Sequence, residues 1–284
     1  MFANNPFAEL SALISADTMQ GYVILMAVLV AAGTILDMMH KKSAKYFFQD
    51  SEKNRKNAKR TVSTGEKAGL AVATIASEVL TSSEFANTKR RLSHLLTMYG
   101  FILFVASSGL MIFECDSIAA STLATVWHIG ALMLCVGGYW FWFFIRVDVN
   151  SEGVKFWQLR RADLFIVSVL LTATFALIWS YMQSNGGVVA DMGLTALFFA
   201  LFVISNTVLF STVMWSKFAH MFFKPAAAFQ KRVAFAEGSD LNLPEDFDLS
   251  SAAVHEKFPD IPEYMGKNPE NMGPGIRREP ANHY

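Results

Sequence analysis

Cysteine is scarce in this chain of 284 residues, which contains only Cys115 and Cys135. An iron–sulfur cluster is normally held by four thiolates, so we expect no cluster in this chain. The two cysteines also lack the spacing of a metal-binding motif. Lysine and arginine are absent from residues 1–20, so this segment lacks the charged region that begins a cleaved signal peptide.

Proline is missing between Pro6 and Pro225, and charged residues make up only 17% of the chain. Hydrophobic residues make up 53%, and the mean hydropathy is +0.32. This composition is typical of an all-α polytopic membrane protein rather than a soluble domain. A helix needs about 20 apolar residues to cross a bilayer. Five runs without proline meet this length: 21–39, 93–113, 122–145, 162–181 and 192–215.

The basic residues lie in alternate connections, which predicts the orientation of the bundle. The loop 40–92 contains twelve Lys or Arg, the segment 146–161 contains four, and the part after Trp215 contains eight. The 114–121 and 182–191 connections contain none. Basic loops stay on the cytoplasmic side, so we expect the amino terminus outside and the carboxy terminus in the cytoplasm of a bacterial inner membrane.

Two segments outside the spans are candidates for contacts with partners. The basic loop 40–92 can attract anionic lipid or a soluble protein, and its part 65–80 is expected to form an interfacial or buried amphipathic helix. The tail 233–284 contains ten acidic residues and six of the eight prolines. It is expected to be extended, either as a free terminus or ordered along a cytoplasmic partner. We expect no nucleic-acid partner.

Two histidines are predicted to share one depth on different helices. His94 lies near the start of the second span, and His220 follows the fifth span, where Pro225 is expected to end the helix. Two imidazoles facing each other can hold a b-type haem. Cations at helical spacing could pair with haem propionates, namely Arg90, Arg91, Lys217 and Lys224. Alternatively, these histidines are interfacial residues among cations that fix topology.

The other membrane histidines are weaker candidates. His128 in the third span has no second histidine at its depth, so we expect either an interfacial residue beside Trp127 or a contact to a quinone carbonyl. A second candidate position for a quinone is near Trp157 at the inner face. His40 ends the first span and is an alternate haem ligand, while the tail histidines are expected to be solvated.

Carboxylates are expected only near the membrane surfaces. Asp37 and Asp163 lie within one turn of cytoplasmic helix ends, where we expect water to reach them. No acidic residue falls at the middle of a span, where it would mark an ion pathway. A transporter of small solutes is therefore disfavoured.

The order of these features resembles a known group of membrane subunits. Five spans, a histidine early in the second span and the ending "KFAHMFFKP" resemble the cytochrome b anchor subunits of the respiratory nitrate reductase type. In that group a His followed by Pro after the last span is a haem ligand, which implies this role for His220, with His94 as its partner. The distal ligands of di-haem members are missing from "YGFILFVASS" and "GLTALFFALFVISNTV", so the resemblance implies one haem.

Within that group, the tail is similar to that of adenylylsulfate reductase membrane anchors. This resemblance implies a soluble flavin and iron–sulfur reductase on the cytoplasmic face, which exchanges electrons with membrane quinone. The chain would then be an electron-transfer subunit or a quinone-reactive subunit. The alternative is a haem-free structural anchor that recruits a cytoplasmic redox enzyme.

Overall fold

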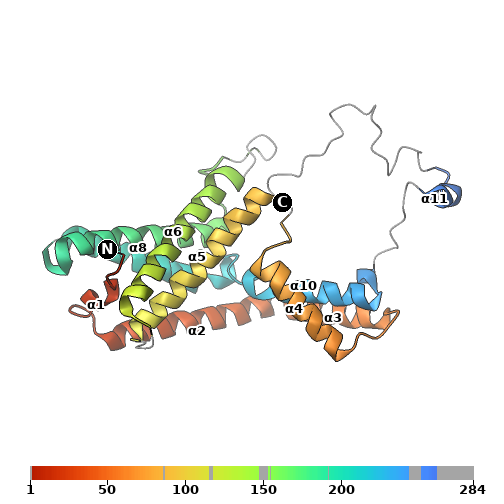
Figure 1. Cartoon of the computed structure of the whole chain (residues 1–284), viewed down its shortest axis with the longest axis horizontal. Helices are drawn as coiled ribbons and strands as arrows, with labels where there is room; N and C mark the ends of the chain where they lie inside the picture. Colours follow the sequence, from red (N-terminus) through yellow and green to blue (C-terminus); the bar gives the residue numbers. More distant parts are fainter. Residues whose placement is uncertain are drawn as a thin grey trace.

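A computed structural model describes residues 2–85, 87–114, 118–146, 153, 155–190, 192–242 and 251–260. The described chain is all-helical, and no strand occurs in these residues (Figure 1). Five helices are long and apolar enough to cross a membrane, as the sequence predicts. The protein is therefore a multi-pass helical membrane protein by the length and composition of its helices.

The helices that form the bundle are α2, α5, α6, α8 and α9. In chain order the elements are α1 Pro6–Leu10, α2 Ala16–Lys41, α3 Ser43–Lys56, α4 Thr64–Thr74, η1 Ile75–Leu80, α5 Thr88–Ile112, α6 Ala120–Trp140, η2 Phe141–Ile145, η3 Arg161–Asp163, α8 Leu164–Ala190, α9 Met192–Ser211, η4 Val213–Trp215, α10 His220–Glu237, η5 Asp240–Asn242 and α11 Ala252–Lys257.

Local signals set several helix starts. The Ser15 side chain accepts a hydrogen bond from the Thr18 amide at the start of α2, and the Asn87 side chain accepts from the amides of Lys89 and Arg90 at the start of α5. Such caps satisfy amides that have no partner within the helix. Because they extend a helix beyond its apolar run, α2 and α5 begin five residues before the predicted spans.

Glycine allows α5 and α6 to pack with their backbones in contact. A methyl group added at Gly130 would lie 2.7 Å from the Phe104 backbone nitrogen, and one added at Gly100 would lie 2.8 Å from the Gly130 carbonyl oxygen. Small residues bring membrane helices together in this way. The core continues into α8 through Trp127 and Trp179, whose side chains are almost fully buried.

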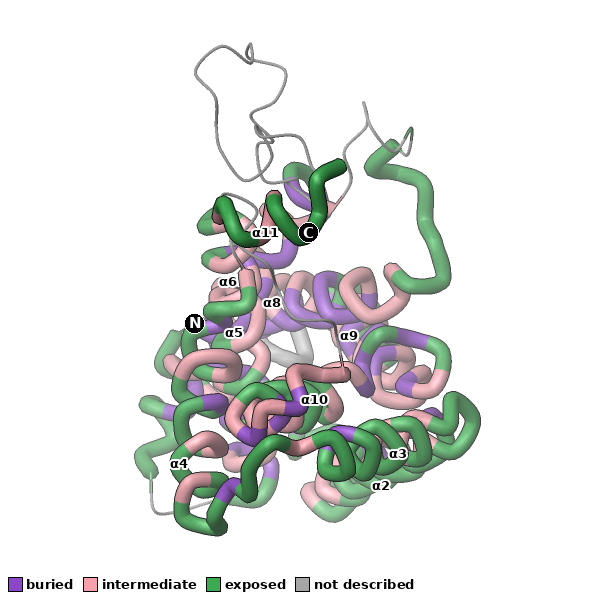
Figure 2. Tube along the Cα trace, turned by 90° about the vertical axis from the view of Figure 1, so that its right-hand side faces the viewer, coloured by how far each residue is buried: buried purple, intermediate pink, exposed green. Residues whose placement is uncertain are grey.

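Helix α2 lies at the edge of the bundle, and much of its length is exposed (Figure 2). Ile24, Val28 and Leu36 are among its apolar side chains that are more than half exposed. Apolar side chains on such a face suit contact with lipid. The close approach of Gly33 to Val213, where a methyl group would lie 2.9 Å from Cβ, joins α2 to the segment after α9.

One end of the bundle is covered by α3, α4, η1 and α10, which lie together in Figure 1. We call this end the basic end. It is the end of the bundle where α2, η2 and α9 finish and where α5 and α8 begin, at Lys41, Ile145, Ser211, Thr88 and Leu164 respectively. The 65–80 segment is helical, as expected, and packs against α10. Arg232 in α10 forms an ion pair of 2.9 Å with Glu78 in η1.

The expected boundary of the tail is wrong. Helix α10 continues to Glu237, whose carbonyl oxygen accepts hydrogen bonds from the Lys59 and Arg60 amides at 2.8 and 3.1 Å. Asn242 then donates to the Asn54 side chain at 2.5 Å. Residues 233–242 therefore belong to the folded basic end, because backbone groups of the first loop pair with them. The remaining tail prediction falls largely on 243–250 and 261–284, outside the described residues.

The fifth span also ends earlier than expected. Helix α9 stops at Ser211, and the chain turns through η4 before α10 begins at His220. Val213, which is fully buried, packs on Gly33 at this turn. Pro225 lies inside α10 rather than at a helix end. The prediction that Pro225 ends a helix was wrong. Proline removes one backbone hydrogen bond from α10, but contacts with neighbouring helices hold α10 along its length and offset this loss.

Candidate functional site

His94 lies in the first turns of α5, where the preceding loop folds over it. Its Nδ1 atom hydrogen-bonds to the Ser82 hydroxyl at 3.0 Å, and its ring lies 4.9 Å from the Phe85 ring centroid. Arg91 donates to the Thr81 carbonyl oxygen of this loop and Tyr99 to the Leu80 carbonyl oxygen at the end of η1, so both contacts hold the start of the loop against α5. The His94 ring is therefore oriented by contacts on one side.

His220 is the first residue of α10 and not part of a span. Its Nδ1 contacts the Lys217 carbonyl oxygen, and its ring lies 6.1 Å from that of Phe165 in α8. A carbonyl oxygen can only accept, so Nδ1 carries the proton and Nε2 of the neutral ring keeps its lone pair. Burial, aided by the charge of Lys224, holds the pKa of His220 below its ordinary value, although the bond to the Lys217 carbonyl oxygen raises it. The ring is therefore neutral at pH 7.

Both histidines lie at the basic end, His94 on α5 and His220 on α10, and the charges of Glu84 and Lys224 act on both rings. Lys224 of α10 forms an ion pair of 2.6 Å with Glu84 of the loop that covers His94, and its Nζ lies 5.2 Å from the Phe85 ring centroid. Loop 81–87 and the first turns of α10 therefore meet at one site, which we call the histidine pair site: Ser82, Glu84, Phe85, Arg90, His94, His220 and Lys224.

The four predicted cations separate into two groups. Arg90 lies with its guanidinium carbon 5.6 Å from the Phe85 ring centroid, and Lys224 lies on the same ring, so both belong to the histidine pair site. Arg91 instead donates to the Thr81 carbonyl oxygen at 2.7 Å. Lys217 is exposed and interacts with Asp163. Arg90 and Lys224 are therefore the better candidates for partners of an anionic group.

The donor set of this site fits a bis-imidazole haem. Nδ1 of each histidine is held by a protein group, whereas no described residue hydrogen-bonds to Nε2 of either ring. Iron-binding imidazoles typically coordinate through one nitrogen while the other is oriented by a hydrogen bond. Arg90 and Lys224 bring two positive charges, of which Glu84 offsets one through its ion pair with Lys224 at 2.6 Å, and the remaining positive charge suits a propionate. His40 is exposed on the last turn of α2 and contributes nothing to this arrangement.

His128 has no free ring nitrogen for a hydrogen bond to a quinone. Its side chain is fully buried in α6. Nδ1 bonds to the Ala124 carbonyl oxygen at 2.7 Å, and Nε2 bonds to the Ser180 hydroxyl of α8 at 2.8 Å. Both ring nitrogens are thus satisfied within the protein, and the histidine joins two spans as a structural residue. Trp157 is exposed in the connection before α8.

The expectation that water reaches the two inner carboxylates is wrong for Asp37. This side chain is 1% exposed and forms an ion pair of 2.6 Å with Lys41, one turn further along α2. The next helix and the turn after α9 pack against this end of α2, and they exclude water. Asp163 is partly exposed and forms a bidentate ion pair with Arg146, with Nε to Oδ1 at 2.8 Å.

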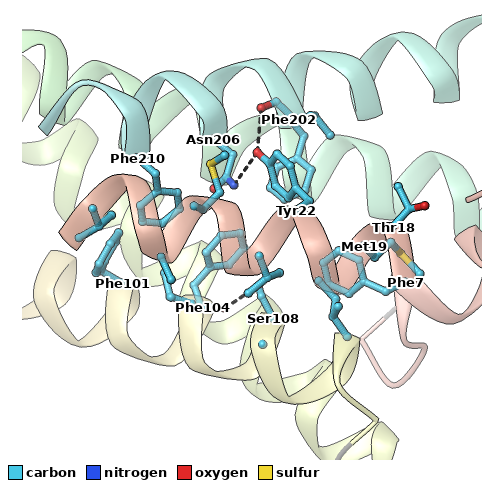
Figure 3. A pocket seen from close by; sticks show the side chains of 18 of the residues that line it. Phe7, Thr18, Met19, Tyr22, Phe101, Phe104, Ser108, Phe202, Asn206 and Phe210 are labelled. Atoms are coloured by element: carbon cyan, nitrogen blue, oxygen red, sulfur yellow. Dashed lines mark hydrogen bonds between the residues drawn. The ribbon is translucent and has the colours of Figure 1, made fainter. Parts of the chain in front are cut away.

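A cavity of about 570 Å³ lies between α2, α5 and α9 (Figure 3). It extends from α1 to the start of α10, and nearly all of its lining is aliphatic or aromatic. Its polar residues include Tyr22 from α2, Ser108 from α5 and Asn206 from α9. This cavity was not predicted. Its sequence signal is a single asparagine within the apolar run of the fifth span.

Comparisons with known proteins place the chain in no family. No family model, curated protein or solved structure matches it.

Proposed function

We propose that the chain is an electron-transfer membrane subunit that binds one b-type haem through His94 and His220. The carrying observation is that these two imidazoles lie at one end of the bundle on two different helices, each with Nδ1 held by a protein group and Nε2 without a partner among the described residues. A haem held by two imidazoles carries single electrons and offers no open iron position for oxygen chemistry.

The protein residues around the pair have separate tasks in this proposal. The Ser82 hydroxyl and the Lys217 carbonyl oxygen orient the two rings. Phe85 and Phe165 shield them from water. Arg90 and Lys224 provide positive charge for the propionates, and Glu84 holds Lys224 in place at 2.6 Å. Removing water strengthens each of these electrostatic contacts.

The basic end is proposed to face the cytoplasm of a bacterial inner membrane. All basic residues of the bundle connections cluster there, which supports this orientation. A soluble flavin and iron–sulfur reductase, of the adenylylsulfate reductase type by sequence resemblance, is the proposed electron partner on this surface. Membrane quinone is the proposed partner within the bilayer.

A haem-free anchor is the second candidate, and the contacts of His94 favour it. Ser82, Phe85 and His94 together fix loop 81–87 to α5, so His94 has a structural role whether or not it binds iron. In this candidate function the basic end serves only to recruit a soluble enzyme.

Haem content separates the two candidates. The full-length protein is purified from haem-sufficient cells, and haem per chain is measured by the pyridine haemochrome assay and a reduced-minus-oxidised spectrum. We expect one haem per chain, with complete loss in His94→Ala and in His220→Ala. The matched control is His40→Ala, which removes an exposed imidazole at the same end of the bundle and should keep the haem.

Membrane insertion and thermal unfolding of each variant show whether haem loss reflects the missing ligand or a misfolded chain. Wild-type protein without haem would support the structural anchor. Haem retained at one per chain in both single variants would refute this ligand pair.

A further inference from the structure

The cavity between α2, α5 and α9 has the size and the lining of a ligand site. Its volume of about 570 Å³ lies within the usual range for small-molecule pockets. Cavities with apolar walls do not hold ordered water and instead accept apolar molecules. The protein itself leaves this space open beside α2, whose outer face is exposed (Figure 2).

Asn206 gives the cavity unused hydrogen-bonding capacity. Its Nδ2 donates to the Tyr22 hydroxyl oxygen at 3.1 Å. The Tyr22 hydroxyl lies 2.9 Å from Thr207 Oγ1 and 3.3 Å from the Val203 carbonyl oxygen, to which it can donate, and the Thr207 hydroxyl donates to the same carbonyl oxygen at 2.7 Å. The second N–H and the Oδ1 of Asn206 therefore have no partner among the described residues. An unsatisfied amide in an apolar membrane segment is costly, so a bound polar group would stabilise it.

The chemistry of a carboxamide restricts the ligand. Asn206 can donate to a carbonyl oxygen and can accept from a hydroxyl group, so it can bind both forms of a quinone–quinol pair. It lies within the span Gly193–Ser211, five residues before the end of α9. A charged headgroup at this position would be expensive, which argues against a phospholipid headgroup and for a neutral ring.

The cavity also reaches the histidine pair site. Phe218, Met221 and Phe222 line its end, and they flank His220 in sequence. Phe218 contacts Phe165, whose ring lies 6.1 Å from that of His220. A ligand in the cavity would thus lie close to the proposed electron carrier, which favours a ligand that is itself redox-active.

We propose that this cavity is the quinone site of the protein, with Asn206 bound to a ring oxygen and Tyr22 orienting the carboxamide. The isoprenoid tail lies along the apolar wall formed by α2 and α5. This assignment rests on the proposed function, because the choice of a redox ligand depends on the nearby histidine pair.

The test uses the full-length protein in quinone-free phosphatidylcholine nanodiscs, titrated with decylubiquinone. Quenching of tryptophan fluorescence reports binding, since Trp127 donates to Ser108 at the cavity wall at 2.8 Å. We expect saturable quenching in the wild type and an affinity at least about tenfold weaker in Asn206→Leu. The control Asn185→Leu changes an asparagine at the end of the fourth span that does not line the cavity, and it should bind normally.

A second pair of variants tests the volume rather than the hydrogen bond. Ala27 lines the cavity, so Ala27→Phe should fill it and abolish saturable quenching. Ala31 is exposed one turn further along α2 and does not line the cavity, so Ala31→Phe should leave binding unchanged. Equal affinity in Ala27→Phe and the wild type would refute the site.

Two further outcomes separate this inference from the proposed function. Competition by decylbenzene as strong as that by decylubiquinone would overturn the quinone assignment, because the ring oxygens would contribute nothing. Saturable, Asn206-dependent binding in protein that contains no haem would support the quinone site while refuting the electron-transfer function. Haem at one per chain without saturable quinone binding would support the haem proposal and refute the quinone site.

Discussion

The α5–α6–α8 side of this helix bundle is closely packed, whereas the α2 side is not. On the α5–α6–α8 side, backbones touch at glycines, and the Trp127 and His128 rings form hydrogen bonds with Ser108 and Ser180 on neighbouring helices. On the α2 side, a cavity of about 570 Å³ remains, and Asn206 keeps hydrogen-bonding capacity unused. The tight side therefore maintains the fold, whereas the open side and the basic end carry the two proposed binding sites.

The largest effect on stability is expected from a methyl group added on the tight side. Gly130→Ala would place Cβ 2.7 Å from the Phe104 backbone nitrogen, so α5 and α6 must separate. We expect a loss of about 2–3 kcal/mol in unfolding free energy, measured as a lower unfolding temperature in detergent. The matched change is Gly109→Ala, on the face of α5 that lines the cavity. The added methyl group meets nothing within 4 Å and should not destabilise the protein. Equal losses would contradict the difference between the two sides.

A smaller effect is expected from the polar contact between α6 and α8. Ser180→Ala removes the hydroxyl group that bonds to His128 Nε2 at 2.8 Å and leaves a fully buried ring nitrogen without a partner. This should cost about 1–3 kcal/mol of unfolding free energy and leave haem content unchanged. A loss of haem without a loss of stability would instead make His128 a candidate haem ligand.

The smallest effect is expected from acidification of the basic end. Burial keeps the pKa of folded His220 below its unfolded value of about 6.5, so the unfolded chain takes up the proton first. The stability of the haem-free protein, in which Nε2 of His220 can take up a proton, should therefore fall between pH 7 and pH 5.5. Unfolding temperatures at the two pH values should show a smaller decrease in His220→Gln than in the wild type. The control His40→Gln should retain the full decrease, because His40 is exposed.

Sequence alone predicted the five spans, and it predicted that His94 and His220 lie at the same end of the bundle on different helices. Long apolar runs and the clustering of basic residues are strong signals, because a bilayer leaves few alternatives. The break after Ser211 has no glycine or proline to mark it, since it depends on Val213 packing against Gly33. The burial of Asp37 likewise depends on packing at the end of α2. Such tertiary contacts are not encoded in local patterns.

The cavity could not be found from periodicity, because a lining residue and a lipid-facing residue have the same apolar character. Asn206 was a usable signal, since an amide within a span calls for a partner. Its meeting with Tyr22 joins residues 184 positions apart and therefore required the fold.

The pairing of the first loop with α10 sets an order of events during synthesis. Lys59 and Arg60 bond to the backbone of Glu237, so the first loop leaves the ribosome long before its partner exists. Domains fold as their chain emerges, from the amino terminus onward. The basic end must therefore wait for nearly the whole chain, and His220 reaches His94 only then. A chain that ends before α10 would insert its spans without assembling the histidine pair site, so the proposed haem could load only after α10 has been made.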